Sequence, residues 1–213
     1  MTRTKLKRIE KANELPNVFK IGTVSKENVF GDFFKSTGPI TLEIGCGHGD
    51  YSVELGKRFP DRNFIGMDIK GARIYNGAMN AIDKKLNNVA FIIGRAEKLG
   101  EVFGTNTIEE IYIPFPDPHV RRTSERRRLV SPGFLKLYKE ILVDDGTVHF
   151  KTDNEGLFDY ALKVISEFGC GILFQTKDLY ESKKEEDRSE IKTKYEEHYI
   201  RVKRKICYVQ FKF

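Results

Sequence analysis

The chain has 213 residues, 39% of them hydrophobic and 32% charged, which suits one large globular domain with a sizeable core. No apolar run approaches the roughly 18 residues that a membrane span needs, and the polar N-terminus lacks the apolar core of a signal peptide. The three cysteines and four histidines show no metal-ligand spacing, which argues against a disulfide framework and a metal centre. We therefore expect a cytoplasmic protein that binds no metal and no membrane.

The positive charge of the chain is unevenly distributed. Lysine and arginine number 37 against 31 acidic residues, a net charge of +6. Residues 1–11 carry five cations against Glu10, and residues 121–128 carry five arginines against Glu125. Clusters of this kind suit a polyanion, although charge alone favours nucleic acid only slightly over a merely basic protein.

The chain alternates between strand and helix patterns. Residues 1–38 are interpreted as a basic N-terminal arm and connecting segment, and residues 39–213 as the main domain. The first predicted strand, ITLEIG at 40–45, is a short apolar run ending at glycine. The segment after Gly49 has apolar residues at helical spacing and ends before Pro60. Further strands are predicted at 63–69, 88–94, 108–115, 146–152 and 171–176, with helices at 72–86, 132–142 and 157–168.

The last segment, ICYVQFKF at 206–213, alternates in a way that suggests an antiparallel strand. The early strands are almost wholly apolar, as expected when helices cover both faces of a sheet. The sequence thus predicts an α/β fold with a mostly parallel, doubly wound sheet and an antiparallel C-terminal strand, in which ligands bind beyond the carboxyl ends of the strands. The charged segment 177–192 is expected to be a loop, either a lid over a site or, more commonly, an exposed connection.

A glycine-rich loop, EIGCGHG at 43–49, directly follows the first of these strands. Its glycines, Gly45, Gly47 and Gly49, leave a bare backbone against which a ligand can lie. Asp50 stands where the dinucleotide fingerprint G-x-G-x-x-G would need glycine, and the Gly-Lys-Ser/Thr of a phosphate loop is absent. The alternative is a glycine turn needed only for close packing of strand and helix.

Two acidic residues accompany this loop. Glu43 ends the first strand and could face a cationic group, while Asp68 ends the second and can accept hydrogen bonds from both hydroxyls of a ribose. Together they suit a ligand that combines a nucleoside with a charged amino-acid tail and lacks phosphates. S-adenosylmethionine is such a ligand, and we expect it as the cofactor.

Asp117 lies between prolines in the stretch PFPDPHVRRTSERRRL at 114–129. Because proline fixes φ and removes a backbone donor, this stretch is neither a helix interior nor a central strand. The simplest interpretation is a turn followed by a solvated helix. The alternative is a rigid mount for one carboxylate, followed by arginines that can bind phosphate.

From about residue 40 onward the chain resembles the bacterial tRNA (guanine-N7-)-methyltransferases of the TrmB type. Their signature F-x-D-P-W-x-K-K-R-H-x-K-R-R-L is similar to residues 115–129, and FKTDN (150–154) and TKYEE (193–197) resemble two further elements. The resemblance implies a Rossmann-like class I fold that depends on S-adenosylmethionine. It also implies methyl transfer to N7 of a guanine in the variable loop of tRNA, by a monomer or homodimer.

The resemblance also assigns roles to residues. Asp117 would be the catalytic residue, at both cofactor and substrate. The expected cofactor-binding residues are Glu43, Gly45, Gly47, Gly49, Asp68, Ile69, Arg95, Ala96 and Asp117. The expected substrate-binding residues are Arg121, Asp153, Thr193, Lys194, Tyr195 and Glu196. The chain departs from the family pattern at Arg95, usually an acid or amide, at His119, usually tryptophan, and at Thr123 and Ser124, usually Arg-His.

The implied reaction requires the protein mainly to position the guanine. Guanine N7 carries a lone pair and no proton, so methyl transfer to it requires no base. Asp117, with Asp153 as a second candidate, could accept hydrogen bonds from guanine N1–H and the exocyclic amine and stabilise the positive charge that forms on the ring.

Two alternatives remain at this point. An amino-group RNA methyltransferase of the same fold tends to carry Asn/Asp-Pro-Pro-aromatic after its fourth strand, and FPDPH is only partly similar to that motif. A non-catalytic RNA-binding protein could keep the fold without the reaction. The presence of Glu43, Asp68 and Asp117 argues against the second alternative.

Overall fold

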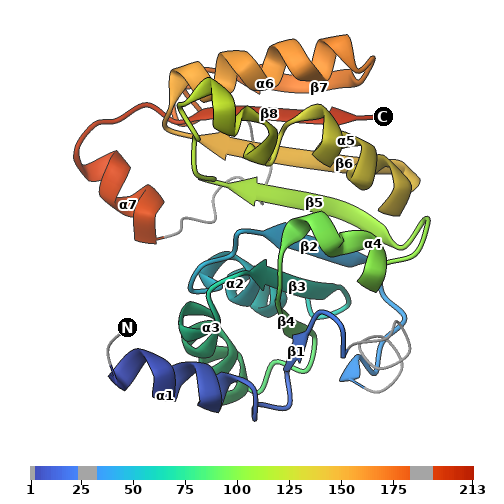
Figure 1. Cartoon of the computed structure of the whole chain (residues 1–213), viewed down its shortest axis with the longest axis vertical. Helices are drawn as coiled ribbons and strands as arrows, with labels where there is room; N and C mark the ends of the chain where they lie inside the picture. Colours follow the sequence, from blue (N-terminus) through green and yellow to red (C-terminus); the bar gives the residue numbers. More distant parts are fainter. Residues whose placement is uncertain (1–2, 24–32, 183–193) are drawn as a thin grey trace.

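A single sheet forms the centre of the molecule (Figure 1). The structure is a computed structural model that describes residues 3–23, 33–182 and 194–213. In these ranges the strands are β1 (Val18–Lys20), β2 (Ile40–Ile44), β3 (Asn63–Asp68), β4 (Val89–Ile93), β5 (Ile108–Pro114), β6 (Leu142–Thr152), β7 (Gly171–Thr176) and β8 (Cys207–Lys212). Their order is β1-β4-β3-β2-β5-β6-β8-β7, and among these strands only the pairings of β8 are antiparallel. The predicted fold class is confirmed.

Helices cover both faces of this sheet (Figure 1). The α-helices are α1 (Arg3–Ala12), α2 (Asp50–Arg58), α3 (Gly71–Asp83), α4 (Leu99–Val102), α5 (Pro132–Ile141), α6 (Glu155–Glu167) and α7 (Lys194–Arg201), with short 3₁₀ helices η2 (Ala96–Lys98) and η3 (Arg122–Arg127). One apolar core lies between the sheet and α4, α5 and α6, and a second lies between the sheet and α2 and α3. Because both faces are covered, the strands in the middle of the sheet are apolar along their whole length.

The predicted strands all form, and most differences lie at element ends. The second predicted helix, 72–86, ends at Asp83 because Lys85 takes a left-handed φ of 56°. The amide of Leu86 then donates to the carbonyl of Ala81, as in a helix C-cap. Local backbone geometry of this kind leaves little trace in the hydrophobic pattern.

The N-terminal segment joins the fold more closely than its sequence suggested. We interpreted residues 1–38 as an arm and connecting segment, but within residues 3–23 α1 packs against α3 and β1 pairs in parallel with β4. Asn17 holds the junction, because its side chain donates to the carbonyl of Ala78 (3.1 Å) and its own carbonyl accepts from the amide of Phe91 (2.8 Å). A strand of three residues is too short to produce a recognisable alternation.

The parallel strands place their carboxyl ends along one edge of the sheet, where the candidate site lies. Of the predicted loop 177–192, residues 183–192 lie outside the described residues, and residues 177–182 form a turn after β7. No helix among the described residues is both long and apolar enough to cross a membrane. The described residues also contain no group of three or more His, Cys, Asp or Glu side chains placed to hold a metal ion.

Candidate active site

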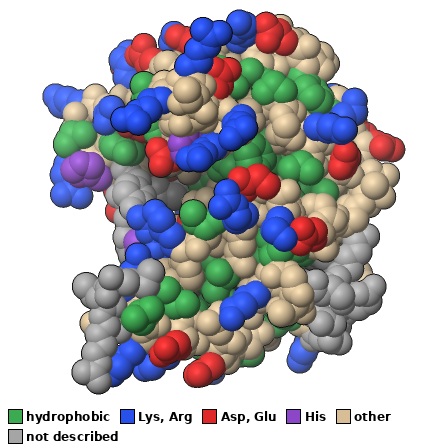
Figure 2. Space-filling view, in the orientation of Figure 1, with side chains coloured by type: hydrophobic (Ala, Val, Ile, Leu, Met, Phe, Trp, Pro, Cys, Tyr) green, Lys and Arg blue, Asp and Glu red, His purple; other side chains and the backbone are tan. Residues whose placement is uncertain are grey.

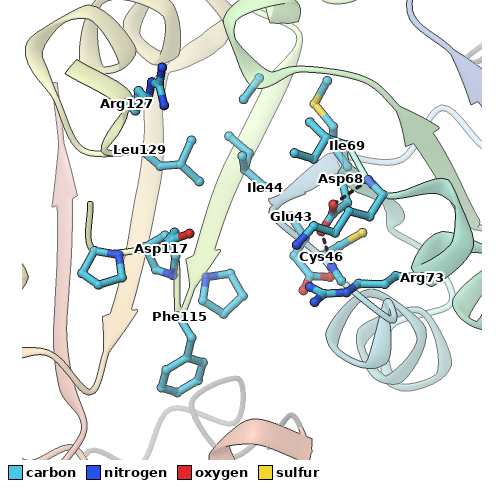
Figure 3. A pocket seen from close by; sticks show the side chains of 18 of the residues that line it. Glu43, Ile44, Cys46, Asp68, Ile69, Arg73, Phe115, Asp117, Arg127 and Leu129 are labelled. Carbon is cyan, nitrogen blue, oxygen red and sulfur yellow. Dashed lines mark hydrogen bonds between the residues drawn. The ribbon is translucent and has the colours of Figure 1, made fainter. Parts of the chain in front are cut away.

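A cleft of about 900 Å³ opens at the carboxyl ends of β2, β3, β4, β5 and β6 (Figure 3). The loop after β2 and the end of β3 form one wall, and the loop after β5 forms the wall opposite. Residues following β6 and α7 complete the rim. The cleft therefore collects segments that are far apart in the sequence, as expected at this edge of a doubly wound sheet.

The glycine loop reverses the chain tightly between β2 and α2. The amides of Gly45 and Cys46 donate to the carbonyl of Met67 at 2.8 and 3.0 Å, which ties the loop to β3. Gly47 and Gly49 both have left-handed φ angles, 55° and 70°, but for different reasons. A Cβ on Gly49 would lie 2.4 Å from the Phe91 ring, whereas one on Gly47 would meet nothing within 4 Å. Gly49 thus serves packing, and Gly47 presents bare backbone to open space.

Asp68 links the carboxyl ends of β2 and β3. Its Oδ2 accepts from the amide of Gly47 (3.0 Å) and its Oδ1 from the amide of Lys70 (2.8 Å), as the dashed lines in Figure 3 indicate. Each carboxylate oxygen has a second lone pair and can accept a further hydrogen bond. Asp68 is thus fixed in place and still able to receive the two hydroxyls of a ribose.

Glu43 lies deeper in the same wall, with only 2% of its surface exposed. Its Oε2 accepts from both the amide (3.0 Å) and the hydroxyl (2.5 Å) of Ser52 in α2. Burial raises the pKa of this carboxyl group to about 8, against the opposing effect of the Ser52 hydrogen bonds, and the charges of Asp50 and Asp68 raise it further. A cation placed beside Glu43 would favour its ionised form.

The next part of the cleft follows β3 and β4. Ile69 is an apolar side chain that is 63% exposed, and together with Ala96 it offers apolar surface to a flat ring. The guanidinium of Arg95 forms an ion pair with Glu97, Nη2 to Oε1 3.0 Å, at the rim. Where the family pattern has an acid or amide, this chain therefore has a cation paired with the acid two residues later.

These features fit S-adenosylmethionine. Glu43 matches a cationic amino-acid tail, Asp68 matches ribose hydroxyls, and Ile69 with Ala96 matches a purine ring. The bare backbone at Gly47 leaves room for the connecting atoms. The fit rests on the chemistry of the donor and acceptor groups and on the open space beside the loop.

Asp117 lies on the opposite wall of the cleft (Figure 3). It is exposed, in a loop that starts where the amide of Phe115 donates to the carbonyl of Lys151 on β6 (2.8 Å). Phe115 and His119, two residues to either side, have left-handed φ angles of 51° and 42°. Such angles are uncommon outside glycine and require support from surrounding contacts. The loop therefore has a specific shape, with Asp117 at its centre.

Another part of the rim is formed by residues after β6 and by α7 with the turn that follows it. Asp153 follows β6, and its Oδ2 forms an ion pair with Nη1 of Arg204 at 3.0 Å. Arg204 lies over the ring of Tyr199 at 5.4 Å, and that ring lies 5.6 Å from the ring of Phe115. Sequence reasoning missed both residues: Tyr199 lies within α7, and Arg204 reaches the cleft only through the turn after that helix, where Lys203 has a φ of 55°.

The other predicted substrate-binding residues differ in their position relative to the cleft. Arg121 is exposed at the start of η3, next to the Asp117 loop. Thr193 lies outside the described residues, and Lys194 and Tyr195 open α7. Glu196 is fully enclosed: its Oε1 accepts from Nζ of Lys151 (3.2 Å) and from the hydroxyl of Tyr180 (2.6 Å). In this structure Glu196 therefore contacts the protein interior and does not line the cleft.

Comparison with known proteins gives a consistent result. Residues 37–209 match a family model described as "Putative methyltransferase". The chain is 42% identical over 197 residues to the tRNA (guanine-N(7)-)-methyltransferase of Christiangramia forsetii, covering 92% of this chain and 86% of that protein. It is 36% identical over 166 residues to the enzyme of the same name from Bacillus subtilis, covering 78% and 76%.

Solved structures with little sequence identity share the fold. The 16S rRNA methyltransferase KamB superimposes with a TM-score of 0.65 at 14% identity, covering 87% of this chain and 92% of that one. A SAM-dependent methyltransferase from Aquifex aeolicus superimposes with a TM-score of 0.55 at 14% identity, covering 87% and 88%. The fold similarity and the sequence similarity agree, and the chain belongs to the tRNA (guanine-N7-)-methyltransferase family.

Proposed function

We propose that this protein transfers the methyl group of S-adenosylmethionine to N7 of a guanine in the variable loop of tRNA, in the cytoplasm. Family membership supports the reaction. The observation that carries the proposal is the arrangement of acids in one cleft, with Glu43 and Asp68 on one wall and Asp117 on the wall opposite. A cofactor bound along the wall of Glu43 and Asp68 would face a guanine bound against the wall of Asp117.

In this proposal the wall that carries Glu43 and Asp68, here called the cofactor wall, binds S-adenosylmethionine. When bound, S-adenosylmethionine supplies an electrophilic methyl group on a positively charged sulfur. Asp68 would accept hydrogen bonds from the ribose, and ionised Glu43 would face the ammonium group. The hydrogen bond from the amide of Gly47 to Asp68 fixes the Asp68 carboxylate and the glycine loop relative to each other before the ligand binds. Binding therefore loses little conformational entropy at these groups.

The opposite wall, which carries Asp117 and is here called the substrate wall, must position the guanine. N7 is a lone-pair nucleophile, so the protein needs to align it and to tolerate the positive charge that appears on the ring. A fixed carboxylate accepting from N1–H and the exocyclic amine does both, and good alignment can be worth about 7–11 kcal/mol. Asp117 suits this role better than Asp153, because Asp117 is exposed in the cleft whereas Asp153 is already engaged by Arg204.

The surface around the cleft suits RNA. Arg121, Arg122, Arg126 and Arg127 are exposed on one side, and Lys70 and Arg73 line the other. On the face seen in Figure 2, Lys and Arg side chains are interspersed with apolar ones around the middle of the molecule. Arginine contacts to phosphate provide affinity and register without reading the base sequence, which leaves guanine selection to the cleft.

Methyl transfer to unmodified tRNA, followed by nucleoside analysis, tests the proposal. We expect N7-methylguanosine, located in the variable loop by fragment mapping. A product methylated on an exocyclic amine would instead identify an amino-group methyltransferase. Binding of tRNA without measurable affinity for S-adenosylmethionine would identify a non-catalytic RNA-binding protein.

A further inference from the structure

The five arginines that follow the Asp117 loop are not equivalent. Arg121, Arg122, Arg126 and Arg127 are exposed, whereas Arg128 is partly buried. The guanidinium of Arg128 points back to the loop: its Nε donates to the carbonyl of Pro118 (3.2 Å) and its Nη2 to the carbonyl of His119 (3.3 Å). These two carbonyls belong to the two residues directly after Asp117.

A third element holds the same guanidinium. The Arg128 guanidinium carbon lies 4.2 Å from the ring centroid of Tyr160 in α6, a distance at which the cation interacts with the face of the ring. Arg128 therefore joins the Asp117 loop to a helix that packs in the main core, where Ala161, the neighbour of Tyr160, is fully buried.

The loop needs such support because of its own composition. Pro116 and Pro118 have no N–H to donate, so few hydrogen bonds within the loop can define its shape. His119 has a φ of 42°, which a non-glycine residue keeps only when its surroundings hold it there. The bond from the Phe115 amide to Lys151 fixes the start of the loop, and Arg128 fixes its end.

We infer that Arg128 is a positioning residue for the Asp117 carboxylate and not one of the phosphate-binding arginines. This inference rests on the proposed function, since it concerns how the same site is held. A guanidinium can reach two carbonyls and stack on a ring at once because its donors form a planar fork, whereas lysine presents a single ammonium group. The part of Tyr160 in this arrangement is to hold the guanidinium against the loop.

Steady-state kinetics on the full-length enzyme separates positioning from phosphate binding. Arg128→Ala and Tyr160→Leu should lower kcat by about 10- to 100-fold, the effect of displacing a group by about 1 Å, with little change in KM for tRNA or in its salt dependence. Arg128→Lys should resemble Arg128→Ala. Tyr160→Phe keeps the ring but loses the hydroxyl, which interacts with Arg128 and Glu125, so its kcat should fall between those of wild type and Tyr160→Leu. Arg126→Ala, the matched exposed arginine, should raise KM for tRNA and reduce the salt dependence while leaving kcat nearly unchanged.

Hydrogen exchange gives a second readout that needs no substrate. The amides of Phe115, Asp117, His119 and Val120 should exchange faster in Arg128→Ala and in Tyr160→Leu than in wild type, and at the wild-type rate in Arg126→Ala. This result would stand even if the wild-type enzyme made no N7-methylguanosine, which would refute the proposed function alone. Exchange unchanged in Arg128→Ala, or a raised KM with reduced salt dependence like that of Arg126→Ala, would overturn the inference. If Arg128→Ala does not fold, the same criteria apply to Tyr160→Leu and Arg128→Lys.

Discussion

Lys151 and Glu196 form an ion pair in the interior, with Nζ and Oε1 3.2 Å apart and side-chain exposures of 3% and 0%. The pair joins β6, the strand that leads to Asp153, to α7, the helix that contains Tyr199 and leads to Arg204. The two sequence elements that resemble the family, FKTDN and TKYEE, therefore meet in space. Burial lowers the pKa of Lys151, and the neighbouring charge of Glu196 opposes that effect.

Breaking this pair should destabilise the fold. Lys151→Met leaves the Glu196 carboxylate enclosed without its cation, and we expect the free energy of unfolding to fall by about 3–5 kcal/mol. Lys151→Met combined with Glu196→Gln removes both charges and keeps an acceptor for Tyr180, so it should recover much of that stability. Denaturant titration measures both values.

The matched control is Lys163, whose ion pair with Glu167 lies on the surface of α6 with side-chain exposures of 71% and 65%. Lys163→Met should change the free energy of unfolding by less than about 1 kcal/mol. If Lys151→Met were as mild as this control, the buried pair would not be holding α7 to the sheet.

The pKa of Glu43 gives the stability a pH dependence. In the folded protein it is raised to about 8 from an ordinary value of 4.5, so between these values the folded state holds a proton that the unfolded state has released. The free energy of unfolding should therefore fall as pH rises from about 4.5 to about 8. Glu43→Gln, which cannot ionise, should flatten this part of the profile; an identical slope in wild type and variant would show that the slope comes from other groups.

The affinity for S-adenosylmethionine should depend on pH in the opposite direction to the free energy of unfolding. Because only ionised Glu43 attracts the ammonium group, wild-type affinity for S-adenosylmethionine should improve relative to Glu43→Gln as pH rises towards 8. The ratio of the two dissociation constants, measured by calorimetry, is the appropriate readout because the amine of the ligand itself titrates near this range. A ratio independent of pH would remove Glu43 from the ammonium site.

Asp117 provides the most direct test of the chemistry. Asp117→Ala should lower kcat by at least about 10²-fold, because it removes the fixed acceptor and the charge opposite the forming cation. Asp117→Asn keeps the shape but not the charge and should fall between wild type and Asp117→Ala. Thermal unfolding should stay near wild type, since the Asp117 side chain is exposed. Near-normal turnover by Asp117→Ala on tRNA would refute its catalytic role.

The predictable parts of this molecule are those that repeat a pattern. The central strands could be located because both of their faces are covered, so that four of the five residues of β2 are buried. That Glu43 and Asp68 line the same cleft could be anticipated, because they lie at the ends of neighbouring parallel strands whose carboxyl ends meet at one edge. The hydrogen bond from the amide of Gly47 to Asp68 was not anticipated, because it depends on how the loop after β2 turns.

The parts that could not be predicted depend on contacts between distant segments. Nothing in the residues around Glu196 indicates that Lys151, 45 positions earlier, encloses it. Likewise, Arg128 looks like its four neighbours in the sequence and differs from them only because Pro118, His119 and Tyr160 surround its guanidinium. A run of like charges gives no indication of which member is buried.

The exposed arginines of η3 should account for part of the salt dependence of tRNA binding. Combining Arg122→Ala with Arg126→Ala should weaken binding and lower the slope of log K against log salt concentration by roughly 0.7–0.9 for each phosphate that is no longer neutralised. Arg58→Ala is the matched control, because Arg58 ends α2 at the opposite edge of the sheet and pairs there with Glu54. It removes the same charge per substitution, so any general effect of net charge appears in it too. Equal slopes in the η3 variant and the Arg58→Ala control would mean that Arg122 and Arg126 bind no phosphate.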